Sequence, residues 1–250
     1  MRIIIANWKM NPLIIKDAKA LFEAEARGMK KFKYIETVIC PPACFLSLFS
    51  GAKNIKLGAQ DLFWELQGAY TGQVSGKMLK NIGCEYVIVG HSERRRFAGE
   101  DDEIVSLKLK AALKCGLKPI LCVGEQSGEE MGQIVEKQLK DCLKDISKTQ
   151  LGEIIICYEP VWAISPGVVG SGKPCLPDDA FSANLFIKKV LTAIYSRFLA
   201  EKAVIIYGGS VDSKNAAGFI KEAKMQGALV GGASLVADEF VKIGEAVNGL

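Results

Sequence analysis

The sequence predicts a closed (β/α)8 barrel, eight parallel strands enclosed by helices, as a single domain over residues 1–250. Three observations favour this fold. Short apolar runs rich in β-branched residues recur along the whole chain, segments with helical spacing separate them, and no linker or shift in composition divides the sequence. The length and a hydrophobic content of 49% suit one such barrel.

Each predicted strand is a short run of buried character, as parallel strands covered on both faces require. In order, the eight runs are residues 3–6, 37–40, 55–60, 86–90, 119–123, 154–158, 203–207 and 228–230. Between them, apolar residues recur three or four positions apart, for example within 18–26, 104–112 and 183–194. The alternative is an open doubly wound sheet, but residues 7–11 (NWKMN) lack the glycine-rich turn that such sheets usually carry after the first strand.

Composition excludes several classes of function. The net charge is +4 with lysines scattered among acids, so no nucleic-acid surface is expected. One histidine and eight cysteines without a C-x-x-C pair provide no metal site, and we expect neither metal nor cofactor. The cysteines are predicted to be buried apolar residues in a reducing compartment. The apolar run at 3–6 is too short for a signal sequence or a membrane span, so we expect a cytoplasmic protein without membrane contact.

The only histidine, His91, follows the strand predicted at 86–90. Gly90 allows a sharp exit from that strand, and Ser92 is a plausible N-cap for a short helix. His91 therefore lies where the carboxyl end of a strand meets a helix, which is where ligands gather in parallel α/β folds. A histidine packed between strand and helix, with both nitrogens hydrogen-bonded, is the alternative.

Two further charged residues follow strands. Lys9 and Asn7 come after the first strand, and Glu159 ends the sixth, where Pro160 favours an extended backbone. An ammonium, an imidazole and a carboxylate at one barrel mouth suit proton abstraction next to a carbonyl. Taken singly, Lys9 could be a solvated lysine and Glu159 a member of an ion pair at the rim.

Double glycines follow the last two strands. They occur as Gly208-Gly209-Ser210 and as Gly231-Gly232, each ahead of a predicted helix. Backbone N–H groups at such turns can approach an anion, and the loops after strands seven and eight are the usual phosphate site of this barrel class. The sequence therefore predicts a phosphate-bearing substrate.

Several stretches, in this order, closely resemble the triosephosphate isomerase family over nearly the whole chain. They are residues 6–11, 68–72, 90–95, 158–163, 207–210 and 231–234. The resemblance implies interconversion of dihydroxyacetone phosphate and D-glyceraldehyde 3-phosphate through an enediolate, in glycolysis and gluconeogenesis. It implies Glu159 as the base, neutral His91 as the electrophile, and Lys9 and Asn7 as substrate-binding residues. It also implies a phosphate held around Ser210, Gly231 and Gly232 under a lid that follows Trp162.

The chain departs from the family pattern in two loops. Where the family lid reads W-A-I-G-T-G-K, an alignment that gives residues 162–173 about five extra residues makes Gly170 the phosphate-facing amide. A gapless alignment instead puts Ser165 and Pro166 at the tip, and we favour the first because Pro166 has no N–H to donate. The fifth loop, residues 124–130, is shortened and lacks the usual arginine.

Residues 62–71, after the third strand, are too apolar for a solvated loop. They could fold onto their own barrel. The resemblance instead implies insertion into a second subunit to form a homodimer, with Thr71 reaching the Asn7 and Glu93 region of the neighbour.

We expect the pKa of His91 to lie below its ordinary value of about 6.5. The amino end of a helix, a partly desolvated pocket and the cations of Lys9 and residues 94–96 all oppose the imidazolium. The Glu93 carboxylate would raise the pKa of His91, but Glu93 is expected to pair with Lys9.

A metal-dependent sugar-phosphate epimerase is the competing enzyme class, for which one histidine supplies too few ligands. A catalytically inactive scaffold is the alternative outside enzymes, although Lys9, His91 and Glu159 are all present.

Overall fold

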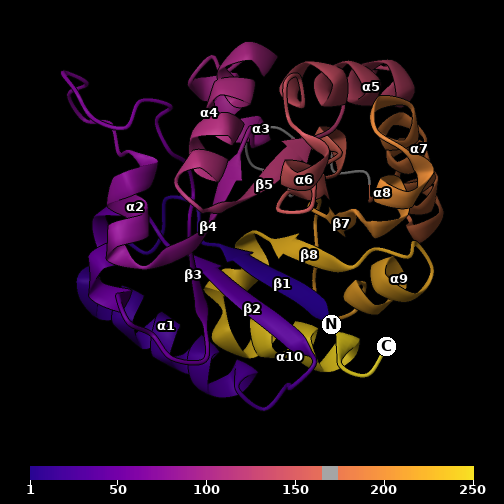
Figure 1. The fold of residues 1–250 in the computed structure, drawn as a ribbon. Helices are drawn as coiled ribbons and strands as arrows, with labels where there is room; N and C mark the ends of the chain where they lie inside the picture. The colour runs from indigo at the N-terminus through magenta and orange to yellow at the C-terminus, as the bar shows by residue number, and fades with distance from the viewer. Residues whose placement is uncertain (165–173) are drawn as a thin grey trace.

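The computed structural model describes residues 1–164 and 174–250. Its eight strands are all parallel and close into a barrel in chain order, with the first strand pairing with the last (Figure 1). They are β1 (Arg2–Asn7), β2 (Ile35–Cys40), β3 (Lys56–Ala59), β4 (Cys84–Val89), β5 (Lys118–Val123), β6 (Ile155–Tyr158), β7 (Val204–Tyr207) and β8 (Gly227–Val230). The predicted fold class is confirmed, and each strand matches a predicted run to within two residues at either end.

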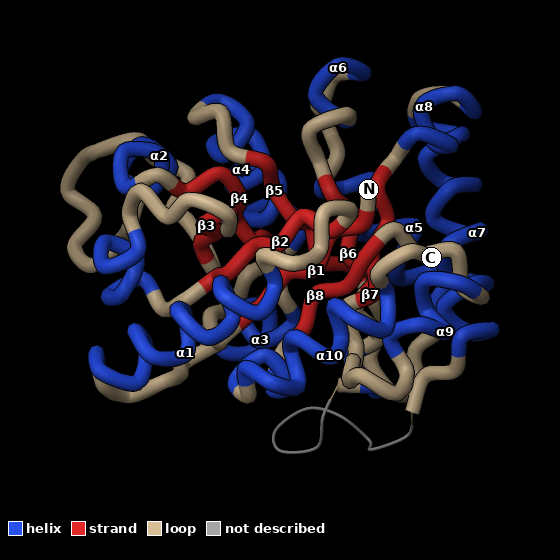
Figure 2. Tube along the Cα trace, turned by 90° about the horizontal axis from the view of Figure 1, so that it is seen from below, coloured by secondary structure: helices blue, strands red, loops and turns tan. Residues whose placement is uncertain are grey.

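Helices surround the strands on all sides (Figure 2). The α-helices are α1 (Ile15–Met29), α2 (Gly76–Ile82), α3 (Ser92–Phe97), α4 (Asp102–Lys114), α5 (Met131–Cys142), α6 (Lys148–Leu151), α7 (Pro177–Ile194), α8 (Arg197–Lys202), α9 (Ala216–Lys221) and α10 (Ala237–Val247). Short 3-10 helices follow three strands: η1 (Ala43–Phe49), η2 (Val161–Ala163) and η3 (Gly232–Leu235). Within the described ranges, none of these helices is both long and apolar enough to cross a membrane.

Alternation along the strands divides the core into two layers. In β1, Ile3 and Ile5 belong to the cluster that fills the barrel, whereas Ile4 and Ala6 belong to the cluster between strands and helices. Because successive strand residues point to opposite faces, a strand buried on both faces must be apolar at every position. This is the physical reason for the continuous runs in the sequence.

The two termini lie together, and glycine-rich loops follow the last two strands. The Arg2 guanidinium donates to the Leu250 carbonyl at 3.2 Å, so the two ends of the chain lie side by side (Figure 1). The glycines after β8 lead directly into η3, as expected. After β7 the glycines also come directly after the strand, but residues 211–215 separate Ser210 from α9.

Candidate active site

Lys9 is held by its backbone as well as by its charge. Its Nζ lies 2.5 Å from Glu93 Oε1, and its N–H donates to Asn7 Oδ1 at 3.0 Å. Gln60, just past β3, donates from Nε2 to the Lys9 carbonyl at 2.7 Å. The φ angle of Lys9 is +54°, a strained conformation for a residue with a side chain. These contacts hold the strained backbone and direct the ammonium toward Glu93.

His91 caps the helix that follows it. Its Nδ1 accepts the N–H of Glu93 at 3.2 Å, and Gly90 before it has a φ of +72°, which glycine adopts readily. The expectation that Ser92 is the N-cap was therefore wrong: Ser92 is the first residue of α3, and the imidazole takes the capping role. A ring whose Nδ1 accepts a hydrogen bond carries its proton on Nε2.

Glu159 is 2% exposed, and three polar groups surround its carboxylate. Its Oε1 lies 3.0 Å from His91 Nε2 and accepts from the Ser92 hydroxyl at 2.9 Å, while Oε2 accepts the Ser92 N–H at 3.0 Å. The loop after β5 lies against the Glu159 backbone, and only a glycine fits there: a Cβ on Gly124 would lie 2.0 Å from the Glu159 carbonyl oxygen. The trio predicted from the strand ends thus meets at one barrel mouth.

The contact between Glu159 and His91 sets the titration of both. Burial raises the pKa of Glu159, but the His91 ring and the Ser92 hydrogen bonds outweigh it and hold that pKa below its usual value. Burial lowers the pKa of His91, but the adjacent Glu159 carboxylate outweighs it and raises that pKa. The expectation of a lowered pKa for His91 is wrong for this arrangement, because it left out a carboxylate that touches the ring.

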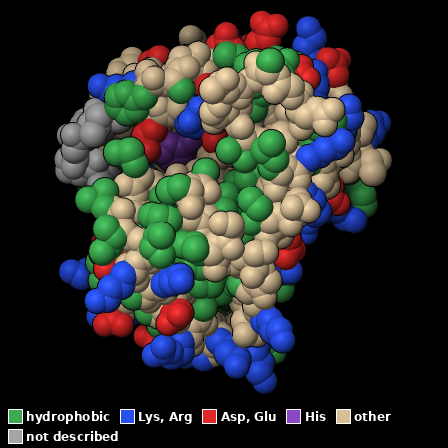
Figure 3. Space-filling model, turned by 90° about the vertical axis from the view of Figure 1, so that its left-hand side faces the viewer, with side chains coloured by type: hydrophobic (Ala, Val, Ile, Leu, Met, Phe, Trp, Pro, Cys, Tyr) green, Lys and Arg blue, Asp and Glu red, His purple; other side chains and the backbone are tan. Residues whose placement is uncertain are grey.

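The hollow that contains these groups opens at the barrel mouth, on the face of the molecule that Figure 3 shows. Figure 3 shows His91, the only histidine, at the bottom of this hollow between acidic and basic side chains. Glu93 lies between Lys9 and His91: its Oε1 binds Lys9, and its Oε2 lies 3.9 Å from His91 Nδ1. A carboxylate base, an imidazole N–H and an ammonium can therefore act on one bound molecule.

The predicted phosphate loops lie at the same mouth. Gly231 is next to Lys9, since a Cβ on this glycine would lie 3.3 Å from Lys9 Cε, and Gly232 is exposed. The Ser210 N–H donates to the Ala163 carbonyl at 3.1 Å. Gly170 lies outside the described residues.

The fifth loop holds the start of the predicted lid. Glu125 is 4% exposed and accepts hydrogen bonds from the Trp162 indole at 2.6 Å and the Tyr158 hydroxyl at 3.1 Å. Gly124 is bonded in both directions to the Gln138 side chain on α5. The short loop is thus anchored to its own helix on one side and to η2 on the other.

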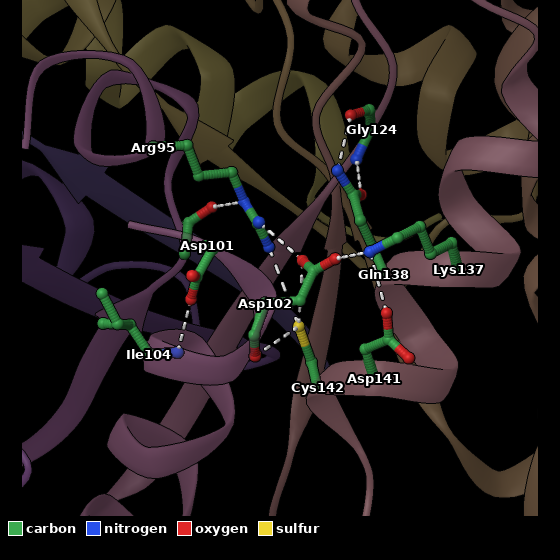
Figure 4. A network of polar contacts seen from close by, with 10 residues as sticks. Arg95, Asp101, Asp102, Ile104, Gly124, Lys137, Gln138, Asp141 and Cys142 are labelled. Carbon is green, nitrogen blue, oxygen red and sulfur yellow. Dashed lines mark hydrogen bonds and ion pairs between the residues drawn. The ribbon is translucent and has the colours of Figure 1, made fainter. Parts of the chain in front are cut away.

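Behind His91, a polar network joins three helices (Figure 4). Arg95 donates from Nε to the Gly90 carbonyl at 2.9 Å and from Nη1 to Asp102 at 2.7 Å. Lys137 of α5 binds the other Asp102 oxygen at 2.9 Å, and Cys142 packs against the same carboxylate. The peptide that precedes His91 is therefore fastened to α4 and α5.

Thr71 lies away from the site of its own chain. It is exposed in the loop after β3, which projects beside α2 (Figure 1). Phe63 contacts both Trp64 and Tyr70, with ring centroids 4.0 and 4.7 Å apart, and Tyr70 is 43% exposed. The loop packs on itself at its base and leaves its tip uncovered.

Sequence reasoning did not assign three residues that the structure places in the site. Glu125 follows a predicted strand, so the signal that selected Asn7 and Glu159 would also have found it. Gln60 was the last residue of the predicted run 55–60, whereas β3 ends at Ala59 and leaves Gln60 just past the strand. Ser92 carried no such signal, because its role depends on Glu159, which is 67 residues away in the sequence.

Fold and site together define a class: a single (β/α)8 barrel enzyme whose mouth combines groups for moving protons beside a carbonyl. The family model described as "Triosephosphate isomerase" matches residues 2–247, and this chain belongs to that family. It is accordingly an isomerase.

Relatives agree over nearly the full length. The chain is 44% identical to the triosephosphate isomerase of Dehalococcoides mccartyi (strain BAV1), over 96% of this chain and 94% of that protein. It is also 44% identical to that of Caldanaerobacter subterraneus subsp. tengcongensis, over 96% and 97%. A crystal structure of the Bartonella henselae triosephosphate isomerase aligns with a TM-score of 0.85 at 35% identity, covering 98% of both chains.

Proposed function

We propose that the protein interconverts dihydroxyacetone phosphate and D-glyceraldehyde 3-phosphate through an enediolate. The observation that carries this proposal is the meeting of Lys9, His91 and Glu159 at one barrel mouth, with Glu159 ionised and buried. A buried carboxylate exposes its charge to a substrate with little competition from water, which strengthens it as a base.

The chemistry follows from these three groups. The Glu159 carboxylate takes a proton from the carbon next to the carbonyl, and the electron pair moves to the carbonyl oxygen. The His91 Nε2–H donates to the developing oxyanion, and the Lys9 ammonium, with Asn7 beside it, stabilises the negative charge. Return of the proton from Glu159 to the neighbouring carbon, with proton exchange between the oxygens at His91, gives the isomer. Atoms and charge balance without a cofactor or a metal.

His91 has to act as a neutral donor, although Glu159 raises its pKa in the arrangement described. A substrate that draws the Glu159 carboxylate toward carbon removes that contact. What remains at the ring is burial, the Glu93 N–H bound to Nδ1 and the Lys9 ammonium, which favour the neutral form, and the Glu93 carboxylate, which favours the charged form but has a smaller effect than burial. The movement of the Glu159 carboxylate toward the substrate therefore also lowers the pKa of His91 and favours its neutral form.

We assign the phosphate to the loops after β7 and β8. Gly231 lies beside Lys9 and Gly232 begins η3, where backbone N–H groups and the ammonium favour an anion. Ser210 and Gly170 belong to the same proposed site. The Ser210 N–H would have to exchange its bond to Ala163 for one to phosphate.

We further propose a homodimer formed through the loop after β3. The exposed Tyr70 ring on this loop supports this, and so does Met10, which is 86% exposed next to Lys9. In such a dimer Thr71 of one subunit would reach Asn7 and Glu93 of the other. Eight free cysteines support a reducing, cytoplasmic location. Membership of the family supports a place in glycolysis and gluconeogenesis.

A coupled assay in both directions tests the activity. The protein should convert each triose phosphate into the other, and a chelator should leave the rate in each direction unchanged. A sugar-phosphate epimerase would lose activity in chelator, and an inactive scaffold would show none. Either result would overturn the proposal.

A further inference from the structure

The main-chain groups of Gly124 point away from the strand beside them. At the end of β5, the Val123 carbonyl accepts the Glu159 N–H at 2.8 Å, and the Glu125 carbonyl accepts the Val161 N–H at 3.0 Å. Alternate residues of a parallel strand bond to opposite neighbours, because successive peptide groups point in opposite directions. The N–H and C=O of Gly124 therefore point away from β6 and toward β4.

β4 does not extend far enough to bind them. Val89, the last residue of β4, lies opposite Leu121, so a strand that reached Gly124 would have to continue beyond His91. Instead Gly90 turns the chain with a φ of +72°, and His91 caps α3. The turn that brings the imidazole to the barrel mouth thus removes the strand neighbour of Gly124. Among the described residues, no main-chain group binds its N–H or C=O.

The Gln138 side chain fills this place (Figure 4). Its Oε1 accepts the Gly124 N–H at 2.8 Å, and its Nε2 donates to the Gly124 carbonyl at 3.2 Å. A side-chain amide carries the same donor and acceptor as a peptide group, so one glutamine can satisfy both. The helix that carries it is fixed by Val135 and Leu139, which are fully buried. α5 thus supports the end of β5 where a strand neighbour is missing.

Gly124 in turn lies against the backbone of the residue assigned as base. A Cβ on this glycine would lie 2.0 Å from the Glu159 carbonyl oxygen and 2.5 Å from its carbonyl carbon, so the two backbones are in direct contact. The Glu159 carboxylate has its own contacts to His91 and Ser92. In the proposed reaction the carboxylate leaves His91 for the substrate, and its position then depends more strongly on the backbone that carries it. A displaced Gly124 would therefore displace the base.

We propose that Gln138 is a positioning residue for the base: by holding Gly124 in place of a strand, it fixes the backbone from which the Glu159 carboxylate reaches the substrate. The effect on catalysis rests on the proposed function, because it requires Glu159 to take the proton. The contacts among Gln138, Gly124 and Glu159 do not.

The first test is steady-state kinetics of Gln138→Met, with Gln133→Met as the matched control. Methionine keeps the length of the side chain but has neither an N–H nor an amide oxygen, and Gln133 is exposed on the same helix. A displacement of about 1 Å costs about a hundredfold, so for a smaller shift we expect kcat of Gln138→Met to fall by about tenfold. KM should change by less than about twofold, because the groups assigned to the phosphate lie on other loops. The control should keep both constants, and a kcat of Gln138→Met equal to that of the control would overturn the proposal.

Gln138→Glu is a second variant that keeps the shape of the side chain and so guards against a methionine variant that does not fold. It retains an acceptor for the Gly124 N–H but sets a carboxylate oxygen against the Gly124 carbonyl, where a donor is needed. It should lower kcat as well, again with little change in KM. A kcat of Gln138→Glu equal to that of wild type would contradict the positioning role.

The imidazole signals of the only histidine test the same contact without activity. Glu159 Oε1 lies 3.0 Å from His91 Nε2, so a displaced Glu159 backbone should change the chemical shifts of the ring at neutral pH. We expect Gln138→Met to move these signals and Gln133→Met to leave them in place. Signals that stay unchanged in folded Gln138→Met would show that Gly124 does not fix Glu159, and the proposal would fail. If the signals move but wild type isomerises no triose phosphate, the positioning contact stands and the proposed function is wrong.

Discussion

The His91 Nε2 lies 3.0 Å from Glu159 Oε1, while the opposite nitrogen of the same ring accepts the Glu93 N–H. The residue assigned as base therefore rests against the residue assigned as electrophile. Protons bound to such a pair belong to both groups, and removing either changes the titration of the other.

The single histidine makes this coupling measurable without resonance assignment. In wild type the imidazole signal should titrate above the ordinary midpoint of about 6.5, because Glu159 raises the pKa more than burial lowers it. In Glu159→Gln the midpoint should fall below that value, since burial then lowers the pKa by more than the nearby Glu93 carboxylate raises it. A midpoint unchanged by this substitution would show that the carboxylate does not contact the ring in solution.

Glu159 is expected to be the base. Glu159→Asp retracts the carboxylate by roughly 1 Å, which should lower kcat by about a hundredfold. Glu159→Gln should lower it by about a thousandfold or more, with little change in the circular dichroism spectrum. Steady-state kinetics on purified variants provide the measurement, and near wild-type turnover by Glu159→Gln would refute the assignment.

Asp102 should stabilise the protein through Arg95 and Lys137. Burial raises the pKa of Asp102, but these two cations outweigh it and lower that pKa. The contribution is therefore present above the unfolded pKa of about 3.9 and is lost as the pH falls through the folded value. Asp102→Asn should reduce the free energy of unfolding by about 2 kcal/mol at pH 7.

Urea unfolding at pH 7 and pH 3.5 checks both the size and the sign, and the loss should shrink at the lower pH. Asp101→Asn is the matched control. Asp101 caps α4 by accepting the Ile104 N–H, a role that asparagine fills equally well. Equal losses for the two variants would mean that the ion pairs with Asp102 contribute nothing.

The aromatic loop after β3 should control assembly. Replacing Phe63, Trp64 and Tyr70 with polar residues should shift sedimentation from dimer to monomer and reduce activity, because Thr71 would no longer reach the neighbouring site. Phe198→Ser, at a residue that is 65% exposed on α8, should leave assembly unchanged. Wild type that sediments as a monomer at micromolar concentration would contradict the proposed homodimer.

The prediction for the pKa of His91 was wrong because it considered only groups that lie near His91 in the sequence or share its predicted pocket. The prediction counted residues 94–96 as cations near the ring. In the structure Arg94 binds Asp61 and Glu100, and Arg95 binds Asp102, so their charge is compensated. The carboxylate that dominates the ring belongs to Glu159, 68 residues further along the chain. Sequence neighbours revealed the helix terminus but not the residue that contacts the ring.

The sequence by itself determined the barrel, the eight strands and the strand ends at which Lys9, His91 and Glu159 lie, because apolar periodicity and glycine turns are local properties of the chain. Only the tertiary structure decided that His91 rather than Ser92 caps α3, that Ser92 holds Glu159, and that Glu93 lies between Lys9 and His91. Each of these depends on the distance between side chains from different elements. Burial then magnifies the effect, because a charge removed from water responds mainly to the few groups that touch it.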